Sequence, residues 1–110
     1  MKKFLVLYRS NLSNEEQMKR AKPGQAQAVM EAWATWSKKH GAALVELGAP
    51  LGDSAVIKGT PGQGHIGGYS IVQGESLDAA KRMFEGHPHF GAPGGGASIE
   101  LLELMSMPGM

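Results

Sequence analysis

Histidine and carboxylate side chains are the groups in this sequence that are best suited to chemistry at neutral pH. The chain contains no cysteine, so thiolate nucleophiles and cysteine-based metal sites are excluded. His87 and His89 lie two residues apart in the stretch EGHPHFGAPGGG, and His65 lies earlier in the chain. A histidine titrates near neutral pH and transfers protons when a carboxylate orients its ring. We therefore predict a catalytic set of Asp53 with His65, His87 and His89.

The same histidines allow two other interpretations. In an extended segment the rings of His87 and His89 would point the same way, as two ligands of one metal ion would. A metal site needs three or four ligands, whereas Gly86 and Pro88 already explain the stretch as the end of a helix and a turn. We therefore predict no metal site. The remaining alternative to proton transfer is that the histidines are unrelated residues of surface loops.

Two glycine-rich strings resemble nucleotide-binding motifs without their context. Residues 62–67, GQGHIG, match GxGxxG, but they lead into a predicted strand instead of joining a strand to a helix. Residues 91–96, GAPGGG, also precede a predicted strand, and they lack the Lys-Ser/Thr pair of a phosphate-binding loop. We interpret both strings as pliable loops and predict that the protein uses no cofactor.

Aromatic and hydroxyl side chains predict a second part of the site. Trp33 and Trp36 are three residues apart, so they share one side of a predicted helix. Aromatic pairs at this spacing are usually core residues, but one indole at a cleft would provide the apolar wall that a small-molecule pocket needs. Tyr8 and Ser10 end the first predicted strand near this helix. We predict that these four residues bind a small ligand.

The hydrophobic pattern predicts six main elements in the order strand, helix, strand, strand, helix, strand. The strands are expected at about 3–9, 42–48, 69–72 and 98–105, with a further short segment at 55–58 that extends or pairs with the second strand. The helices are expected at 25–40 and from Ser76, as the N-cap, to Gly86, and residues 10–24 are expected to be a loop. This order is typical of an α+β, ferredoxin-like βαββαβ fold: a four-stranded antiparallel sheet with two helices on one face.

Length and charge predict one small domain whose main partner is not nucleic acid. The 110 residues suit a single domain over residues 1–110, and a net charge of +1 gives no basic surface for nucleic acid. The first apolar run, Phe4 to Tyr8, is too short for a secretion signal or a membrane span, so we expect no membrane partner and a cytoplasmic location. The first and last strands carry apolar side chains at consecutive positions, whereas two helices cover only one face of the sheet, so the second face also needs cover. This predicts a homodimer packed sheet on sheet.

Four segments of the chain together resemble the YCII-related domain family, in its DGPF-like branch: MKKFLVLY, WATWSKKHGAALVELGAPLG, IGGYSIVQGESLDAAKRMFEGHPHF and ASIELLELMSMPG. The resemblance implies a ferredoxin-like protomer and a dimeric α+β barrel. It also implies a His-Asp pair, in which Asp53 matches the aspartate. The matching histidine is absent, because the first long helix has none before His40 and carries Trp33 and Trp36 instead; the DGPF tetrapeptide is replaced by TPGQGHIGG.

These observations predict a protein that binds a small, partly aromatic molecule in a cleft between the helices and the sheet. If it is an enzyme, the expected chemistry is proton transfer or elimination without a cofactor, of the lyase, isomerase or dehalogenase type, by a His/Asp pair. The alternative is a non-catalytic dimeric module for ligand sensing or protein interaction.

Overall fold

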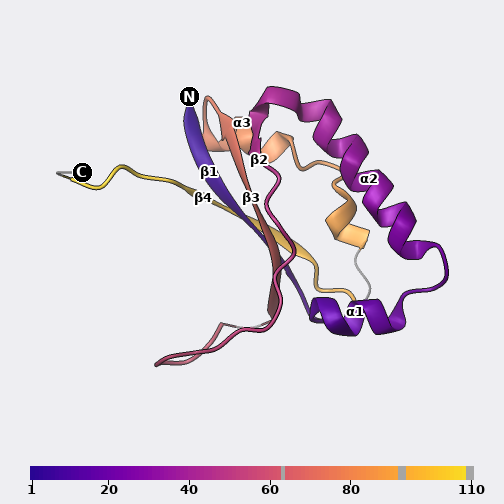
Figure 1. Ribbon diagram of the computed structural model, residues 1–110. Helices are drawn as coiled ribbons and strands as arrows, with labels where there is room; N and C mark the ends of the chain where they lie inside the picture. The colour runs from indigo at the N-terminus through magenta and orange to yellow at the C-terminus, as the bar shows by residue number, and fades with distance from the viewer. Residues whose placement is uncertain (63, 92–93, 109–110) are drawn as a thin grey trace.

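The computed structural model describes residues 1–62, 64–91 and 94–108 and shows a small α+β domain with one four-stranded antiparallel sheet (Figure 1). The strands are β1 (Lys2–Ser10), β2 (Leu44–Glu46), β3 (His65–Gly74) and β4 (Ser98–Glu103). The helices are α1 (Asn14–Arg20), α2 (Gln25–His40) and α3 (Leu77–Arg82), with short 3-10 turns η1 (Gly41–Ala43) and η2 (Pro88–Gly91).

Strand β1 lies inside the sheet, whose order is β2-β3-β1-β4. It pairs with β3 on one side, where Val6 is opposite Ser70, and with β4 on the other, where Val6 is opposite Leu101. Side chains alternate between the two faces of a strand, so the even-numbered residues of β1 share one face. Phe4, Val6, Tyr8 and Ser10 are all buried there, which defines the inner face of the sheet.

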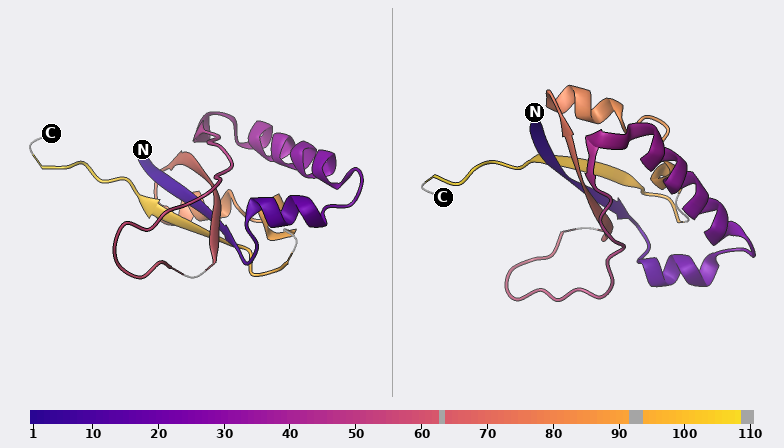
Figure 2. Two further views of the ribbon diagram at one scale, coloured as in Figure 1. Left: turned by 60° about the horizontal axis from the view of Figure 1, so that its bottom comes forward. Right: turned by 45° about the horizontal axis from the view of Figure 1, so that its top comes forward.

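The core fills the space between this inner face and the helices. Trp36 from α2 and Ala80 from α3 pack with the inner face, together with Met83 and Phe84 from the turn that follows α3. Helix α2 therefore contributes its C-terminal half to the core. Its N-terminal half extends beyond the sheet, and Val29 and Met30 remain exposed there (Figure 2).

The outer face of the sheet is also rich in apolar side chains. We define it by the side chains of β1, β3 and β4 that point away from the core: Leu5, Leu7, Tyr69, Ile71 and Leu102. In Figures 1 and 2 the described helices lie on the other side of the sheet from the arm of residues 52–62 and from the C-terminal tail. The arm carries the exposed Val56 and Ile57.

Several elements lie where the sequence predicts them, but one helix does not. The helix at 25–40 is confirmed, and the first and last strands and the helix capped by Ser76 are confirmed with shifted ends. The prediction of a loop at 10–24 is wrong, because α1 occupies part of it. This helix buries no residue; it forms because the Ser13 side chain accepts a hydrogen bond from the Glu16 amide and Lys19 pairs with two glutamates.

Glycines in the middle of the chain explain a second difference. Strand β3 begins at His65, before the predicted start at 69, and Leu51 donates its amide to the Gly67 carbonyl at 3.0 Å. A Cβ at Gly68 would lie 3.3 Å from the Ala49 carbonyl oxygen, so the glycines permit this close approach. Residues 55–58 form no strand and are exposed. Strand β2 has three residues, and α3 ends at Arg82, before Gly86.

Within the described ranges, no helix is both long enough and apolar enough to cross a bilayer.

Candidate functional site

The structure brings five of the eight predicted site residues together on the inner face of the sheet. Tyr8 comes from the end of β1, Trp33 and Trp36 from α2, and His87 and His89 from the segment after α3. The ring of His87 lies at the centre, with centroid distances of 4.5 Å to each indole, 5.3 Å to Tyr8 and 5.5 Å to Phe84. We call Tyr8, Trp33, Trp36, Phe84 and His87 the aromatic cluster.

The two tryptophans have different roles in this cluster. Trp36 is buried, and its indole N–H donates to the Met83 carbonyl at 2.8 Å, which links α2 to the end of α3. Trp33 is only partly buried and meets Tyr8 edge-on, with ring centroids 4.9 Å apart. Trp36 therefore belongs to the core. Trp33 lies at the edge of the cluster, where part of its ring is exposed to solvent.

His87 is held in one neutral form by its hydrogen bonding. Its Nδ1 accepts the backbone N–H of His89 at 3.0 Å, so in the neutral ring the proton is on Nε2. The residue is 2% exposed, and Nε2 has no hydrogen-bond partner among the described residues. Burial, with smaller contributions from the positive charges of His89 and His40, lowers the pKa of His87 to about 4. His87 is therefore a neutral donor at physiological pH.

Tyr8 is also fixed in its neutral form. Its hydroxyl donates to Ser70 Oγ at 2.9 Å, and Ser70 Oγ donates to the Leu47 carbonyl at 2.6 Å. Burial raises the pKa of Tyr8 to about 12, and the hydrogen bond with Ser70 only partly opposes this rise. The phenol therefore contributes an apolar ring to the cluster and is already committed as a donor.

His89 is the histidine of this region with a lone pair available for proton transfer. Its Nε2 lies 2.7 Å from the Arg9 carbonyl oxygen, which accepts only, so Nε2 carries the proton and Nδ1 carries the lone pair. The ring is half-buried and packs edge-on against Tyr8, with centroids 5.4 Å apart. A backbone carbonyl thus orients His89, which is the role that we predicted for an aspartate.

The other predicted residues lie outside the cluster. Ser10 is buried, but its hydroxyl donates to the Leu12 carbonyl at 2.6 Å and accepts from Gln17 Nε2 at 2.9 Å, so it fixes the entry to α1. Asp53 lies exposed in the arm, and His65 lies exposed at the start of β3. In the described part of the chain no carboxylate forms an ion pair or hydrogen bond with a histidine.

Three residues join the site region without having been predicted there. Phe84 packs against His87, Ser70 Oγ accepts the hydrogen bond of the Tyr8 hydroxyl, and the ring centroids of His40 and Trp36 lie 5.1 Å apart. Burial is the main cause that lowers the pKa of His40, with the charge of Lys39 next. The sequence could have indicated Ser70, because it is a polar residue at a position of the strand that alternation places on the same face as Gly68 and Val72.

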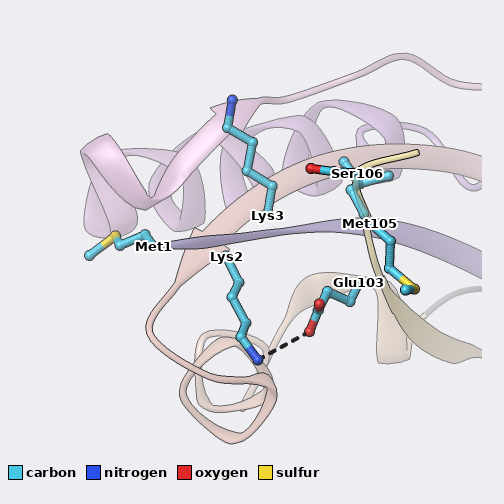
Figure 3. A pocket seen from close by; sticks show the side chains of 7 residues that line it. Met1, Lys2, Lys3, Glu103, Met105 and Ser106 are labelled. Carbon is cyan, nitrogen blue, oxygen red and sulfur yellow. Dashed lines mark ion pairs between the residues drawn. The ribbon is translucent and has the colours of Figure 1, made fainter. Parts of the chain in front are cut away.

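Two hollows on the surface of the described residues lie away from the aromatic cluster. One, of about 450 Å³, is at the opposite end of β1, between the N-terminus and the end of β4 (Figure 3). Its charged side chains include Lys2 and Glu103, which pair at 3.4 Å. A second is lined by four charged residues of α3 and the turn after it: Asp78, Lys81, Arg82 and Glu85. Neither hollow includes a predicted site residue.

The described residues give His87 and His89 no further ligands with which to bind a metal ion. Across residues 1–62, 64–91 and 94–108 there is no group of three or more histidine, aspartate or glutamate side chains that would hold a metal ion. Nδ1 of His87 also already accepts a hydrogen bond from the His89 amide, so its lone pair is not available to a metal ion.

Comparison with known proteins gives no match: no family model fits the chain, and no curated protein is similar enough to count as a relative. The resemblance to the YCII-related family therefore stays a prediction.

Proposed function

We propose that the protein is a YCII-related, ferredoxin-like protein that binds a small, partly aromatic molecule at the aromatic cluster, between α2, η2 and the sheet. The observation that carries this proposal is the convergence of Tyr8, Trp33 and His87 from three distant parts of the sequence. Small-molecule sites are mostly apolar and aromatic, with few polar groups that fix the orientation of the ligand. The order of strands and helices supports the ferredoxin-like assignment.

The cofactor-independent reaction that we propose uses His89 as the proton carrier. Its Nδ1 takes a proton from the ligand, while the Arg9 carbonyl holds the ring through Nε2. His87 cannot act as the base in this geometry, because its Nδ1 lone pair is occupied and its Nε2 carries a proton. Asp53 is exposed in the arm and bonds to no histidine among the described residues, so the Arg9 carbonyl takes the orienting role that we predicted for it.

Binding is tested by recovering the natural ligand. We expect native mass spectrometry of the freshly purified protein to show a bound molecule of low mass. Trp33→Ala should retain this molecule, whereas Trp36→Ala should lose it, because Trp36 is buried in the core and its loss disturbs the packing. A His89→Ala variant should retain this molecule and lose its conversion, whereas Asp53→Ala should keep both. Identical behaviour of the His89 variant and the wild type would contradict the proton-carrier assignment.

The partner that we propose is a second copy of the chain, packed sheet on sheet to give a dimeric α+β barrel. The uncovered apolar side chains of the outer face support this proposal, as do the arm and the tail that extend on that side (Figure 2). A stable dimer buries about 800 Å² on each partner. Light scattering should return twice the 11.6 kDa of one chain.

A matched pair of variants tests the dimer surface. Leu102 on the outer face is 41% exposed and Leu77 on α3 is 46% exposed. Leu102→Glu should shift the mass to that of one chain at micromolar concentration, and Leu77→Glu should leave it unchanged. A wild-type chain that runs as a monomer would contradict the proposed homodimer.

The alternative function is a non-catalytic dimeric module for sensing or interaction. The two surface hollows described above lie away from the aromatic cluster, which favours this alternative. The two functions differ in one observable: the module binds no small molecule at the aromatic cluster, whereas the ligand-binding protein does.

A further inference from the structure

The unpartnered Nε2 of His87 is the polar group of the core whose hydrogen bonding is incomplete. His87 is 2% exposed, and among the described residues it is the one whose buried side-chain nitrogen has no hydrogen-bond partner. Buried donors are nearly always paired in native proteins, because an unpaired one loses its bond with water and gains nothing in return. The other buried donors of this region, the Tyr8 hydroxyl and the Trp36 indole, are both paired.

The hydrogen bonding of His87 defines what kind of group would complete it. Since Nδ1 accepts the His89 amide, Nε2 is a donor, and its missing partner must be an acceptor. A protonated amine or a hydroxyl used only as a donor does not satisfy it.

The surroundings of His87 define the charge of that acceptor. The rings packed against it belong to Tyr8, Trp33, Trp36 and Phe84, and none of them is positively charged at neutral pH. Two titratable rings contact this group, His40 against Trp36 and His89 against Tyr8, and theirs are the charges that act on His87. A carboxylate brought among these rings would lose its hydration without gaining a fixed cation, which is costly. An uncharged carbonyl oxygen carries no such cost.

We propose, building on the ligand-binding function above, that the ligand is an uncharged aromatic carbonyl compound whose oxygen accepts the Nε2–H of His87. Its ring takes the place that Trp33 holds against Tyr8 and His87, and Trp33 turns outward. Trp33 suits this exchange because it is the partly buried ring of the pair, whereas Trp36 is buried and tied to Met83. The exposed Val29 and Met30, about one turn earlier on α2, offer apolar surface for the displaced indole.

The test uses the full chain and two probes of similar shape, acetophenone and ethylbenzene, of which only the first carries an acceptor. The Trp33→Ala variant has the proposed ring position already empty, so it should bind acetophenone more tightly than the wild type does. Binding is followed by the nitrogen-15 shift of His87 Nε2 and by the fluorescence of Trp36. In Trp33→Ala we expect acetophenone to bind about tenfold more tightly than ethylbenzene.

Two variants in the Trp33→Ala background separate the hydrogen bond from the shape of the site. His87→Leu should reduce the preference for acetophenone to about onefold, and His87→Gln, which keeps an N–H donor, should restore part of it. Circular dichroism checks that each variant is folded. Equal binding of both probes while His87 is present would overturn the donor inference and leave the proposed pocket standing. If neither probe binds Trp33→Ala, the proposed pocket and the inference are both wrong.

Discussion

The two faces of the sheet are built from alternate residues of the same strand, yet they have different partners. On the inner face Phe4, Val6 and Tyr8 are 0%, 0% and 3% exposed, because α2, α3 and the turn after α3 cover them. On the outer face Leu5 and Leu7 are only half-buried, although they are equally apolar. The difference shows that the helices of one chain cover only one face of the sheet. The buried polar groups, such as His87 and Ser70, lie on that covered face.

The polar groups of the two faces show the same contrast. On the inner face the Tyr8 hydroxyl is buried and bonded to Ser70, whereas on the outer face the Tyr69 hydroxyl donates to Glu46 at 2.6 Å in an exposed position. The Glu46 hydrogen bond is the main cause that raises the pKa of Tyr69, while burial is the main cause for Tyr8. A polar group on the inner face is thus isolated from water, as a ligand-binding group must be.

The largest effect is expected from removing a large side chain from the inner face. Phe4→Ala should lower the free energy of unfolding by about 3–5 kcal/mol, because Phe4 is fully buried and its loss leaves a cavity. Leu5→Ala, at the neighbouring residue on the outer face, should cost less than half as much when both changes are made in the Leu102→Glu background, which keeps the chain monomeric. Urea denaturation measures both losses. Equal losses in that monomer would contradict the difference in cover between the two faces.

The next effect is a loss of stability in acid that depends on His87. Its pKa is about 4 when folded and near 6.5 when unfolded, so between these values the unfolded chain binds more protons. Stability is therefore full above pH 6.5 and falls as the pH decreases towards 4, by about 2 kcal/mol after allowance for partial screening by solvent.

The matched control for the acid effect is His87→Phe, which keeps an aromatic ring and removes the titration. Urea denaturation of this variant should show a smaller decrease in stability between pH 7 and pH 4 than the wild type shows. The same decrease in both proteins would mean that His87 is accessible to protons while folded. That result would contradict the claim that polar groups on the inner face are isolated from water.

A smaller effect is expected from breaking the hydrogen bond between the Tyr8 and Ser70 hydroxyls on the inner face. Ser70→Ala removes the acceptor of the Tyr8 proton and should reduce the free energy of unfolding by about 1–2 kcal/mol. Glu46→Gln changes the corresponding pair on the outer face, and its urea midpoint should not move, because the pair is exposed to water. A larger shift for the Glu46 variant would reverse the comparison between the faces.

The smallest effect is expected from the ion pair between Arg9 and Glu100, whose nitrogen and oxygen lie 3.5 Å apart on the outer face. Glu100→Gln should change the free energy of unfolding by about 0.5 kcal/mol or less in the monomer, and added salt should remove the difference. A change of several times this size would indicate that the pair is desolvated, as it would be if a second copy covered the outer face.

The sequence allowed good prediction of elements that have an apolar period or a cap of their own. Helix α2 has apolar residues at helical spacing and ends at His40, with Gly41 as its C-cap, and Ser76 caps α3 through the Ala79 amide. Helix α1 was missed because it has no buried side, and its stability comes from a cap and ion pairs that hydrophobic periodicity does not register. The start of β3 was missed because its glycines serve a long-range contact with residues 49–51.

The candidate site was predictable in its residue types but not in its pairing. Tyr8, Trp33 and the histidines at 87 and 89 stand out as chemical groups, and the structure brings them together. Contacts between residues 8, 33 and 87 depend on the fold of the whole chain, so sequence spacing cannot show them. The pairing with Asp53 rested on residue type alone, and the arm places that aspartate on the exposed surface instead.

The most direct test of the account is a nitrogen-15 NMR measurement of the His87 ring at pH 7, in the presence and absence of acetophenone. We predict a neutral ring with the proton on Nε2, protected from exchange with water, and a change of the Nε2 shift when acetophenone binds to Trp33→Ala. A ring protonated on Nδ1, or an Nε2 proton that exchanges freely and does not respond to acetophenone, would contradict the claim that the inner face holds a buried donor for a ligand.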